Sequence, residues 1–458
     1  MHKVVKAHSV NTKINIEKDL TTGNLFSQMV FFSLPIILTS VLQIVFNTAD
    51  VMVLGVLVSD RAVAAVGSTS SLINLLTMLA IGLSTGTNVL LSKCVGSHDE
   101  ERINKTVGVS IVLALVLGCL LILIGQLFSR PILELMECDE NVIDLAEKYV
   151  KIYFLGMPLV VLYNFTSAIL RAAGDSNRPL IYLIVGGMLN VALNFAFITL
   201  FNMDVDGVAI ATIISQGVSA LLSIIALMRA KGIVKLRLKH LRFYKEELIE
   251  IIKIGLPSGI QSSLFSLSNV VLQSAINSFG EFAMAGSSYA MQIDSYVYVA
   301  TNGVSVALMS FISQNYGAKK TDRIKKSIKY GLYLSCVISI VLGVIATLVT
   351  QPIVGALTSD DLVIEYAFRR AIIVCPTYFL CGFMDTCSYT LRGLGKSFTG
   401  MVITLIGACF LRIVWINLFI PITNSYEMIF ISYPVTWLIT ATAELLVLIK
   451  VFKNLKYD

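Results

Sequence analysis

Long apolar runs separated by short polar segments fill the chain from residue 25 onward. A helix that crosses a lipid bilayer needs about 20 mostly apolar residues. Twelve runs meet this requirement, and we expect each to form a membrane-spanning helix: 25–54, 62–91, 106–128, 147–170, 180–201, 207–228, 248–278, 284–313, 327–350, 365–391, 399–420 and 427–449. Five runs contain a proline, which removes one hydrogen bond and bends the helix: Pro35, Pro158, Pro257, Pro376 and Pro434.

The polar connections alternate in their content of basic residues. If residues 1–24 lie in the cytoplasm, most of the 35 Lys and Arg also lie on the cytoplasmic side. The outer side then holds Arg61, Arg130, Lys148, Lys151, Arg369 and Arg370, while Lys253 and Arg412 lie within spans. Short cytoplasmic loops of membrane proteins are rich in Lys and Arg. The distribution predicts a multi-pass protein of the cell (inner) membrane with both termini in the cytoplasm.

The two halves of the chain resemble each other. GSHDEERINKT (96–106) aligns with GAKKTDRIKKS (317–327), LRAAGDS (170–176) with LRGLGKS (391–397), and GSTSS (67–71) with GSSYA (286–290). Six spans fit in each half, so both repeats begin on the same side of the membrane. We predict an all-α membrane protein of two six-helix lobes, 25–228 and 248–450, with a central cavity between them. Residues 229–247 form a basic cytoplasmic linker, and 1–24 and 451–458 are tails.

Composition agrees with this architecture and excludes several others. The 458 residues are 56% hydrophobic and 14% charged, and the mean hydropathy is +0.80, whereas soluble domains are about 25% charged. The eight Cys and four His show no metal-ligand spacing. We therefore expect membrane lipids around the chain, no nucleic-acid partner, no cofactor and, by default, a monomer.

Ionisable side chains inside the spans are costly unless they face a partner or water, so they mark candidate sites. The candidates are Asp50, Asp294, Asp385, Arg412 and Glu444. Asp50 can bind a cation or carry a proton, or neighbouring hydroxyls and amides can satisfy it. Glu444 lies near the cytoplasmic end of the last span, and we expect it to reach the interface.

Asn190 and Asn194 are four residues apart on one face of the fifth span. Together with Thr212 in the sixth span they can offer oxygen ligands to a hard cation such as Na⁺. The alternative is a hydrogen bond between helices in a packed bundle.

The second half offers different candidates. By the repeat, Arg412 takes the place of Asn190 and would repel a cation, and we expect its partner to be Asp385 or Asp294. Such a pair can serve a structural role. The alternative is a functional role, in gating or in contact with the substrate. Asp294 shares a helix face with Tyr298, which suits an organic cation through charge and cation–π contacts, although such tyrosines can simply pack between helices. Polar residues that can line the cavity are Gln43, Asn47 and Gln261.

Four motifs resemble those of the multidrug and toxic compound extrusion (MATE) family, in the MOP flippase superfamily. They are NTADVMVLG (47–55), the pair LRAAGDS and LRGLGKS, SQNYGAKKTDR (313–323) and MLNVALNFAFI (188–198). The resemblance covers essentially the whole chain. It implies the export of small organic molecules, drugs or metabolites that are often cationic, in exchange for inward Na⁺ or H⁺.

The resemblance also implies where the coupling ion binds. Some members use an Asp in the first span, an Asn and an Asp four apart in the fifth, and a Thr in the sixth. The matching residues here are Asp50, Asn190, Asn194 and Thr212, and Asn194 departs from the family's Asp. Another branch uses a glutamate and an aspartate in spans seven and ten, where this chain has Phe265 and Cys381. We therefore expect coupling in the N-terminal lobe.

We thus expect a secondary-active multidrug or metabolite efflux antiporter that works by alternating access of two rocking lobes. The alternative is a flippase for lipid-linked precursors, which would hold a pyrophosphate with basic cavity residues, and Arg412 is the single arginine deep in a predicted span. A membrane-embedded enzyme would need clustered acids at one interface. Asp360 and Asp361 have no second acidic motif, so we expect no enzymatic activity.

Overall fold

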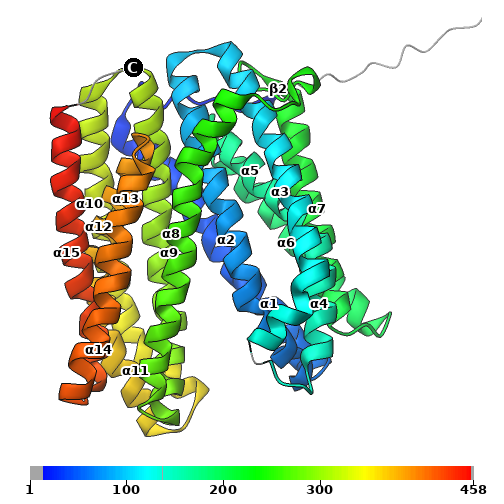
Figure 1. Ribbon diagram of the computed structural model, residues 1–458, viewed down its shortest axis with the longest axis vertical. Coiled ribbons are helices and arrows are strands. Elements are labelled where there is room, and N and C mark those ends of the chain that lie inside the picture. The colour runs from blue at the N-terminus through cyan, green and yellow to red at the C-terminus, as the bar shows by residue number, and fades with distance from the viewer. Residues whose placement is uncertain (1–13, 137, 455–458) are drawn as a thin grey trace, which may run out of the picture.

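The computed structural model describes residues 14–136 and 138–454, and nearly all of them are helical (Figure 1). The first half comprises α1 (Leu25–Leu57), α2 (Asp60–Ser97), α3 (Glu100–Leu135), α4 (Ile143–Leu155), α5 (Met157–Ala172), α6 (Asn177–Thr199) and α7 (Val205–Arg229). The second comprises α8 (Lys245–Asn277), α9 (Glu281–Gly317), α10 (Thr321–Leu357), α11 (Asp361–Val374), α12 (Tyr378–Gly393), α13 (Ser397–Thr404), α14 (Leu411–Thr423) and α15 (Tyr426–Lys453).

These helices account for the twelve predicted spans. Ten segments of the described chain are long and apolar enough to cross a membrane, and α4 with α5 forms an eleventh that is bent by 48°. Pro158 lies in the first turn of α5, directly after this bend, where its missing N–H costs no helix hydrogen bond. The remaining predicted span corresponds to α8, which is not among these eleven. Its 33 residues run the length of its lobe (Figure 1), but they include many Ser, Asn and Gln and are therefore less apolar.

Three short segments interrupt the helices. A turn of 3-10 helix (Cys375–Thr377) separates α11 from α12, and another, Leu238–His240, lies in the linker. Residues Leu405–Phe410 form a π-helical turn between α13 and α14. Outside the spans, strand β1 (Ile14–Asn15) pairs in parallel with β2 (Ala230–Lys231), a feature that the all-α prediction did not include.

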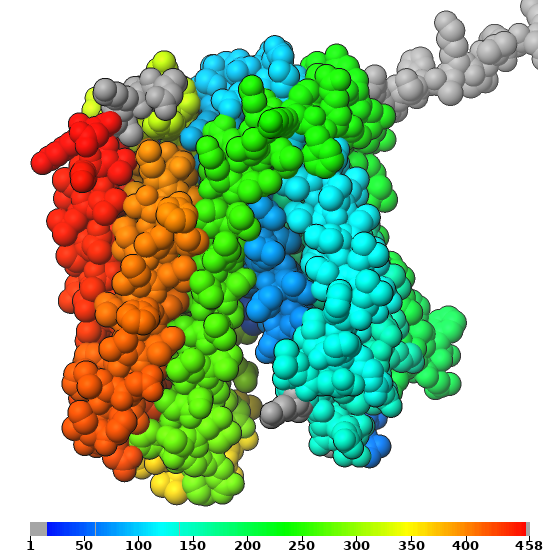
Figure 2. All heavy atoms as spheres, in the orientation of Figure 1, coloured from blue at the N-terminus to red at the C-terminus, as the bar shows by residue number. Residues whose placement is uncertain are grey.

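The two halves form two lobes that meet at one end only. α2 packs against α8 and α9 from Gly82 to Gly96, and we call this the closed end; β2 and the end of α15 lie here too (Figure 1). Toward the other end, which we call the open end, α1 and α4 diverge from α8 and α11. Figure 2 shows the molecule hollowed between the lobes there.

Repeat-related glycines make the contact at the closed end reciprocal. A Cβ on Gly96 would lie 1.9 Å from the carbonyl oxygen of Gln314, and a Cβ on Gly317 would lie 2.0 Å from that of Lys93. Only glycine allows backbones to approach this closely. The internal repeat therefore supplies both sides of the lobe interface.

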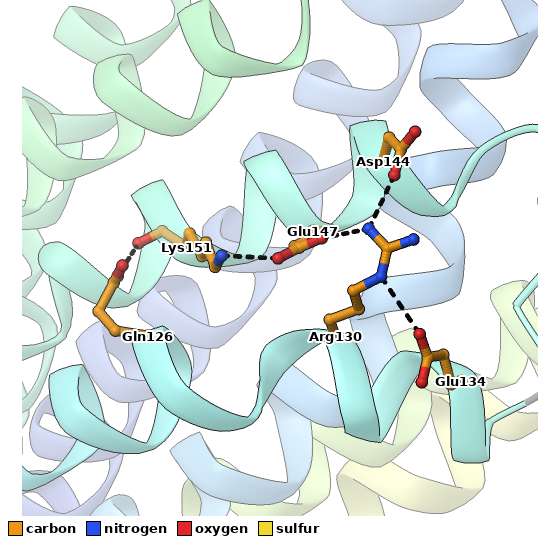
Figure 3. A network of polar contacts seen from close by, with 6 residues as sticks. All are labelled: Gln126, Arg130, Glu134, Asp144, Glu147 and Lys151. Carbon is orange, nitrogen blue, oxygen red and sulfur yellow. Dashed lines mark hydrogen bonds and ion pairs between the residues drawn. The ribbon is translucent and has the colours of Figure 1, made fainter.

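Charged residues fix the open end of the N-terminal lobe (Figure 3). Arg130, near the end of α3, binds Asp144 at 3.0 Å and Glu147 at 2.9 Å on α4. Lys151 pairs with Glu147 at 2.6 Å, and Gln126 donates to the carbonyl oxygen of Lys151 at 2.7 Å. This network holds the bent α4–α5 span against α3.

Candidate functional site

The four residues expected at an N-lobe cation site lie together at the contact of α1, α6 and α7. The side-chain amide of Asn194 donates to Asp50 Oδ1 at 2.5 Å and lies 3.5 Å from Asn190 Oδ1. Asn190 donates in turn to Thr212 Oγ1 at 3.3 Å. The four-residue spacing on α6 places both amides on one face, and packing against α1 and α7 brings them to Asp50 and Thr212.

The chemistry of this cluster suits a small cation. Asn190 and Asn194 are buried, with 4% and 0% exposure, and Asn194 Oδ1 has no hydrogen-bond partner among the described residues. A buried acceptor without a partner is unfavourable, and a hard cation such as Na⁺ prefers carboxylate, amide and hydroxyl oxygens. A proton on Asp50 would neutralise the same charge.

The cluster is close to the exposed surface of α1. Asp50 is half-buried, while Gln43 and Asn47, seven and three residues before it on the same helix face, are exposed. Two tyrosines that sequence reasoning missed, Tyr149 and Tyr153 on α4, lie within electrostatic reach of Asp50. Because both tyrosines lie about a hundred residues after Asp50 in the sequence, no local pattern linked them to it.

In the C-terminal lobe, Asp294 has a partner that the sequence did not predict. Its carboxylate accepts from Arg370 Nη2 at 2.8 Å, and the same arginine donates to Ser287 at 2.8 Å. Both charged groups are buried, with 4% and 3% exposure, so Arg370 faces the interior of the lobe and not a polar loop. Its position within the predicted span 365–391 was a signal that could have revealed this.

Arg412 does not form the expected ion pair. It donates to Thr436 at 3.3 Å and lies over the ring of Tyr433 at 4.1 Å, and within the described chain no salt bridge joins it to Asp385 or Asp294. Asp385 instead accepts from Asn302 at 3.3 Å. The expected pairing is wrong because packing rotates α12 and α14 so that the two side chains face different neighbours.

The other cavity candidates separate into exposed and buried residues. Tyr298 is 43% exposed although Asp294, four residues before it, is buried. Gln261 is 4% exposed and accepts from Arg392 at 2.8 Å, so it does not face the open space. An apolar groove of about 370 Å³ lies between α9 and α10, with Tyr289, Gln292 and Tyr296 in its wall.

Glu444 does not reach the interface as expected. It is 0% exposed, and its Oε1 lies 2.8 Å from Thr404 Oγ1. Distance along a span indicates depth but not which way the helix faces, and α15 turns this residue toward α12 and α13.

Polar contacts across the lobes keep the closed end shut. Glu250 on α8 binds Arg102 of the other lobe at 2.5 Å and lies 4.0 Å from Lys93. Deeper in the interface, Ser310 donates to Asn88 at 3.0 Å and Gln314 donates to the carbonyl oxygen of Ala172 at 2.7 Å.

Comparison with known proteins agrees with this geometry. A family model, MatE, matches residues 35–196 and 257–416, one segment in each lobe. The chain belongs to the MATE family. It is thus a multi-pass membrane protein of a transporter family, with the two-lobe fold that the internal repeat predicted.

Relatives of this chain carry multidrug names. Probable multidrug resistance protein YoeA of Bacillus subtilis (strain 168) is 31% identical over 389 residues, covering 83% of this chain and 84% of the relative. Multidrug export protein MepA of Staphylococcus aureus (strain N315) is 27% identical, covering 82% and 81%.

A solved structure shares the fold of this MATE chain. It is an outward-facing multidrug resistance MATE transporter of the MOP superfamily. It matches with a TM-score of 0.88 and 23% identity, and the match covers 95% of this chain and 98% of that chain.

Proposed function

We propose that this protein is a multidrug or metabolite efflux antiporter that exports small organic compounds in exchange for Na⁺ or H⁺. The observation that carries the proposal is the cluster of Asp50, Asn190, Asn194 and Thr212 beside the exposed face of α1. The multidrug names of the relatives support the substrate class. The mostly apolar groove between α9 and α10 is compatible with organic substrates.

Two lobes that meet at one end support a mechanism of alternating access. Given the bias of Lys and Arg, the closed end faces the cytoplasm and the open end faces outward. A cation then enters the Asp50 cluster from outside, the lobes rock, and substrate enters from the cytoplasm when the closed end opens. The cation drives transport only if it binds the two conformations with different affinities.

The flippase alternative needs basic side chains in the open space. The three arginines inside the C-terminal lobe are instead at most 6% exposed: Arg370, Arg392 and Arg412. Each is engaged by side chains of its own lobe. This placement favours the export of organic compounds over that of pyrophosphate-linked lipids.

Transport in reconstituted vesicles tests the proposal. A Na⁺ gradient and a pH gradient are imposed separately while the movement of a panel of cationic dyes is followed. We expect one gradient to drive dye transport in the wild type and neither to drive it in Asp50→Asn, with Asp139→Asn, an exposed loop carboxylate, as the matched control. Full gradient-driven transport by Asp50→Asn would refute the assignment.

A further inference from the structure

The buried carboxyl of Glu444 is a group that the N-lobe cluster does not use. It lies on α15 against Thr404, the last residue of α13. Its Oε2 atom is buried and has no hydrogen-bond partner in the part of the chain that the structure describes, and neither has the hydroxyl of Ser388 on α12. An unpartnered oxygen this deep in a lobe costs less to bury on a neutral carboxylic acid than on a charged carboxylate.

The contacts of Thr404 indicate the protonation state of this carboxyl. A threonine hydroxyl carries one proton and donates one hydrogen bond at a time. Thr404 Oγ1 lies 2.9 Å from the carbonyl oxygen of Gly400, which can only accept, and 2.8 Å from Glu444 Oε1. If Thr404 donates to Gly400, a protonated Glu444 can donate to Thr404, and both short contacts are satisfied.

Among residues 14–136 and 138–454, no positive group forms an ion pair with Glu444. The titratable groups nearest to Glu444 are Asp385, Cys387 and Arg392, all on α12. The other elements packed against α15 carry further titratable groups, among them Arg370 on α11, Cys409 in the π-helical turn and Arg412 on α14. The arginines bind other side chains, Gln261, Thr436 and Asp294. An ionised Glu444 would be a buried charge beside two neutral hydroxyls, those of Thr404 and Ser388, with the carboxyl of Asp385 nearby, which is strongly unfavourable.

The helix beside Glu444 is irregular. The π-helical turn Leu405–Phe410 begins at the residue after Thr404, and such turns occur frequently at functional sites. A change in this turn would move Thr404, whose hydroxyl contacts the carboxyl at 2.8 Å.

We propose that Glu444 is a proton-binding site of the C-terminal lobe, and that it holds its proton in the conformation with the open end exposed. Thr404 positions the protonated carboxyl. A role of this proton in transport rests on the proposed function, whereas its presence does not.

Infrared difference spectroscopy of the purified full chain tests the proposal. In an Asp50→Asn background, which removes the N-lobe carboxyl, we expect the C=O band of a protonated carboxylic acid at neutral pH. The band should disappear in Glu444→Gln and persist in Glu246→Gln, which alters an exposed carboxylate on α8. Glu444→Asp, which keeps the carboxyl, should retain a shifted band if the glutamine variant fails to fold.

Two outcomes separate this proposal from the proposed function. A spectrum in which Glu444→Gln removes no band overturns the proton site, whatever the transport result. If the band depends on Glu444 but no gradient drives dye transport, the proton site stands and the export function fails.

A second inference rests on residues 14–24, which we call the N-terminal clasp. Its first part binds the N-terminal lobe: β1 pairs with β2, the backbone N–H of Lys18 donates to the carbonyl oxygen of Ala173 at 2.9 Å, and Glu17 accepts from the backbone of Val234 at 2.7 Å. Ile16 and Val234 belong to the apolar core of that lobe.

The second part of the N-terminal clasp binds the other lobe. The backbone N–H of Leu20 donates to Gln314 at 3.1 Å, and Lys320 donates to the carbonyl oxygen of Thr21 at 2.8 Å. The guanidinium of Arg323 contacts the carbonyl oxygens of Leu20, Thr22 and Gly23 at 3.2, 2.5 and 2.9 Å. The segment therefore bridges both lobes across the closed end.

We infer that the N-terminal clasp restrains opening of the closed end, because separating the lobes there must break one of its two sets of contacts. Distances between spin labels at Asn177→Cys and Lys326→Cys, exposed positions on the two lobes, measure this opening in a Cys119→Ser background. We expect Arg323→Ala to increase the population of long distances at least several-fold. Arg323→Lys should have a smaller effect, because lysine keeps one charged donor group although it loses the forked donors.

Lys325→Ala is the matched control, since it removes an exposed basic residue of the same helix. If neither variant changes the distance distribution of the wild type, the role of the clasp is overturned. If both variants lengthen the distances equally, the loss of a positive charge accounts for the effect and the clasp again does not.

Discussion

Asn194 donates its side-chain amide to the carboxylate of Asp50 at 2.5 Å, joining α6 to α1. The amide therefore occupies the place where the family resemblance implied a second carboxylate. One acid and two amides give the cluster at most one negative charge.

Replacing Asn194 with aspartate tests this arrangement. Two carboxylates at this distance cannot both ionise without a cation between them, so we expect Asn194→Asp to bind the driving cation more tightly. The concentration of Na⁺ that half-saturates dye transport should fall by roughly tenfold, which corresponds to about 1.4 kcal/mol. Asn190→Ala, which removes one oxygen, should raise it, and a fall in that variant would contradict the cluster as the cation site.

Part of this cluster could be predicted because it depends on residues that are close together in the sequence. The spacing of Asn190 and Asn194 places both on one helix face. Because a bilayer forces long apolar segments into helices, the spans and the internal repeat could also be predicted from the sequence. Asp50 stood out as an ionisable side chain inside a span, and the motif resemblance then joined Asp50 and Thr212 to the two asparagines in one cation site.

The partners in the C-terminal lobe were not predictable in the same way. Whether Asp294 meets Arg370 or Arg412 depends on how α9, α11 and α14 are rotated about their axes. Side-chain packing decides that rotation, and the hydrophobic pattern of a helix surrounded by lipid and protein constrains it weakly. The burial of Glu444 was missed for the same reason.

The reciprocal glycines at the closed end lead to a second prediction. Because a Cβ on Gly96 would lie 1.9 Å from the carbonyl oxygen of Gln314, Gly96→Leu should force the lobes apart there. Spin-label distances across the closed end should lengthen, and Gly317→Leu should act in the same way.

Gly67 on α2 provides the control for that experiment, since a Cβ there meets nothing within 4 Å. Gly67→Ala should leave the distances unchanged, and it should stabilise the helix by about 0.5–1 kcal/mol. If the distances in Gly67→Ala lengthened as much as in Gly96→Leu, the loss of a glycine from α2, and not the close contact at Gly96, would account for the separation of the lobes.

The buried pair of Asp294 and Arg370 should be important for stability. Removing one partner from such a pair typically costs about 3–5 kcal/mol because the other charge stays buried, so Asp294→Ala should lower thermal stability in detergent strongly. The double variant Asp294→Asn with Arg370→Gln should recover part of the loss. Glu365→Gln, which breaks a more exposed pair with Arg369 at 3.7 Å, should change the free energy of unfolding by less than about 1 kcal/mol.

The Arg130 network at the open end (Figure 3) should behave differently from the buried pair. Arg130 is about half exposed and binds Glu134, Asp144 and Glu147, so solvent and salt screen each contact. Arg130→Ala should therefore cost only about 1 kcal/mol, and the cost should shrink as salt rises from about 0.1 to 1 M, where the Debye length falls from about 10 to 3 Å. The loss for Asp294→Ala should persist at both salt concentrations, because its charges are out of contact with solvent. Thermal unfolding of both variants across the salt series separates the two kinds of contact. If the loss of stability in Arg130→Ala did not depend on salt, the network would hold α4 by packing rather than by charge.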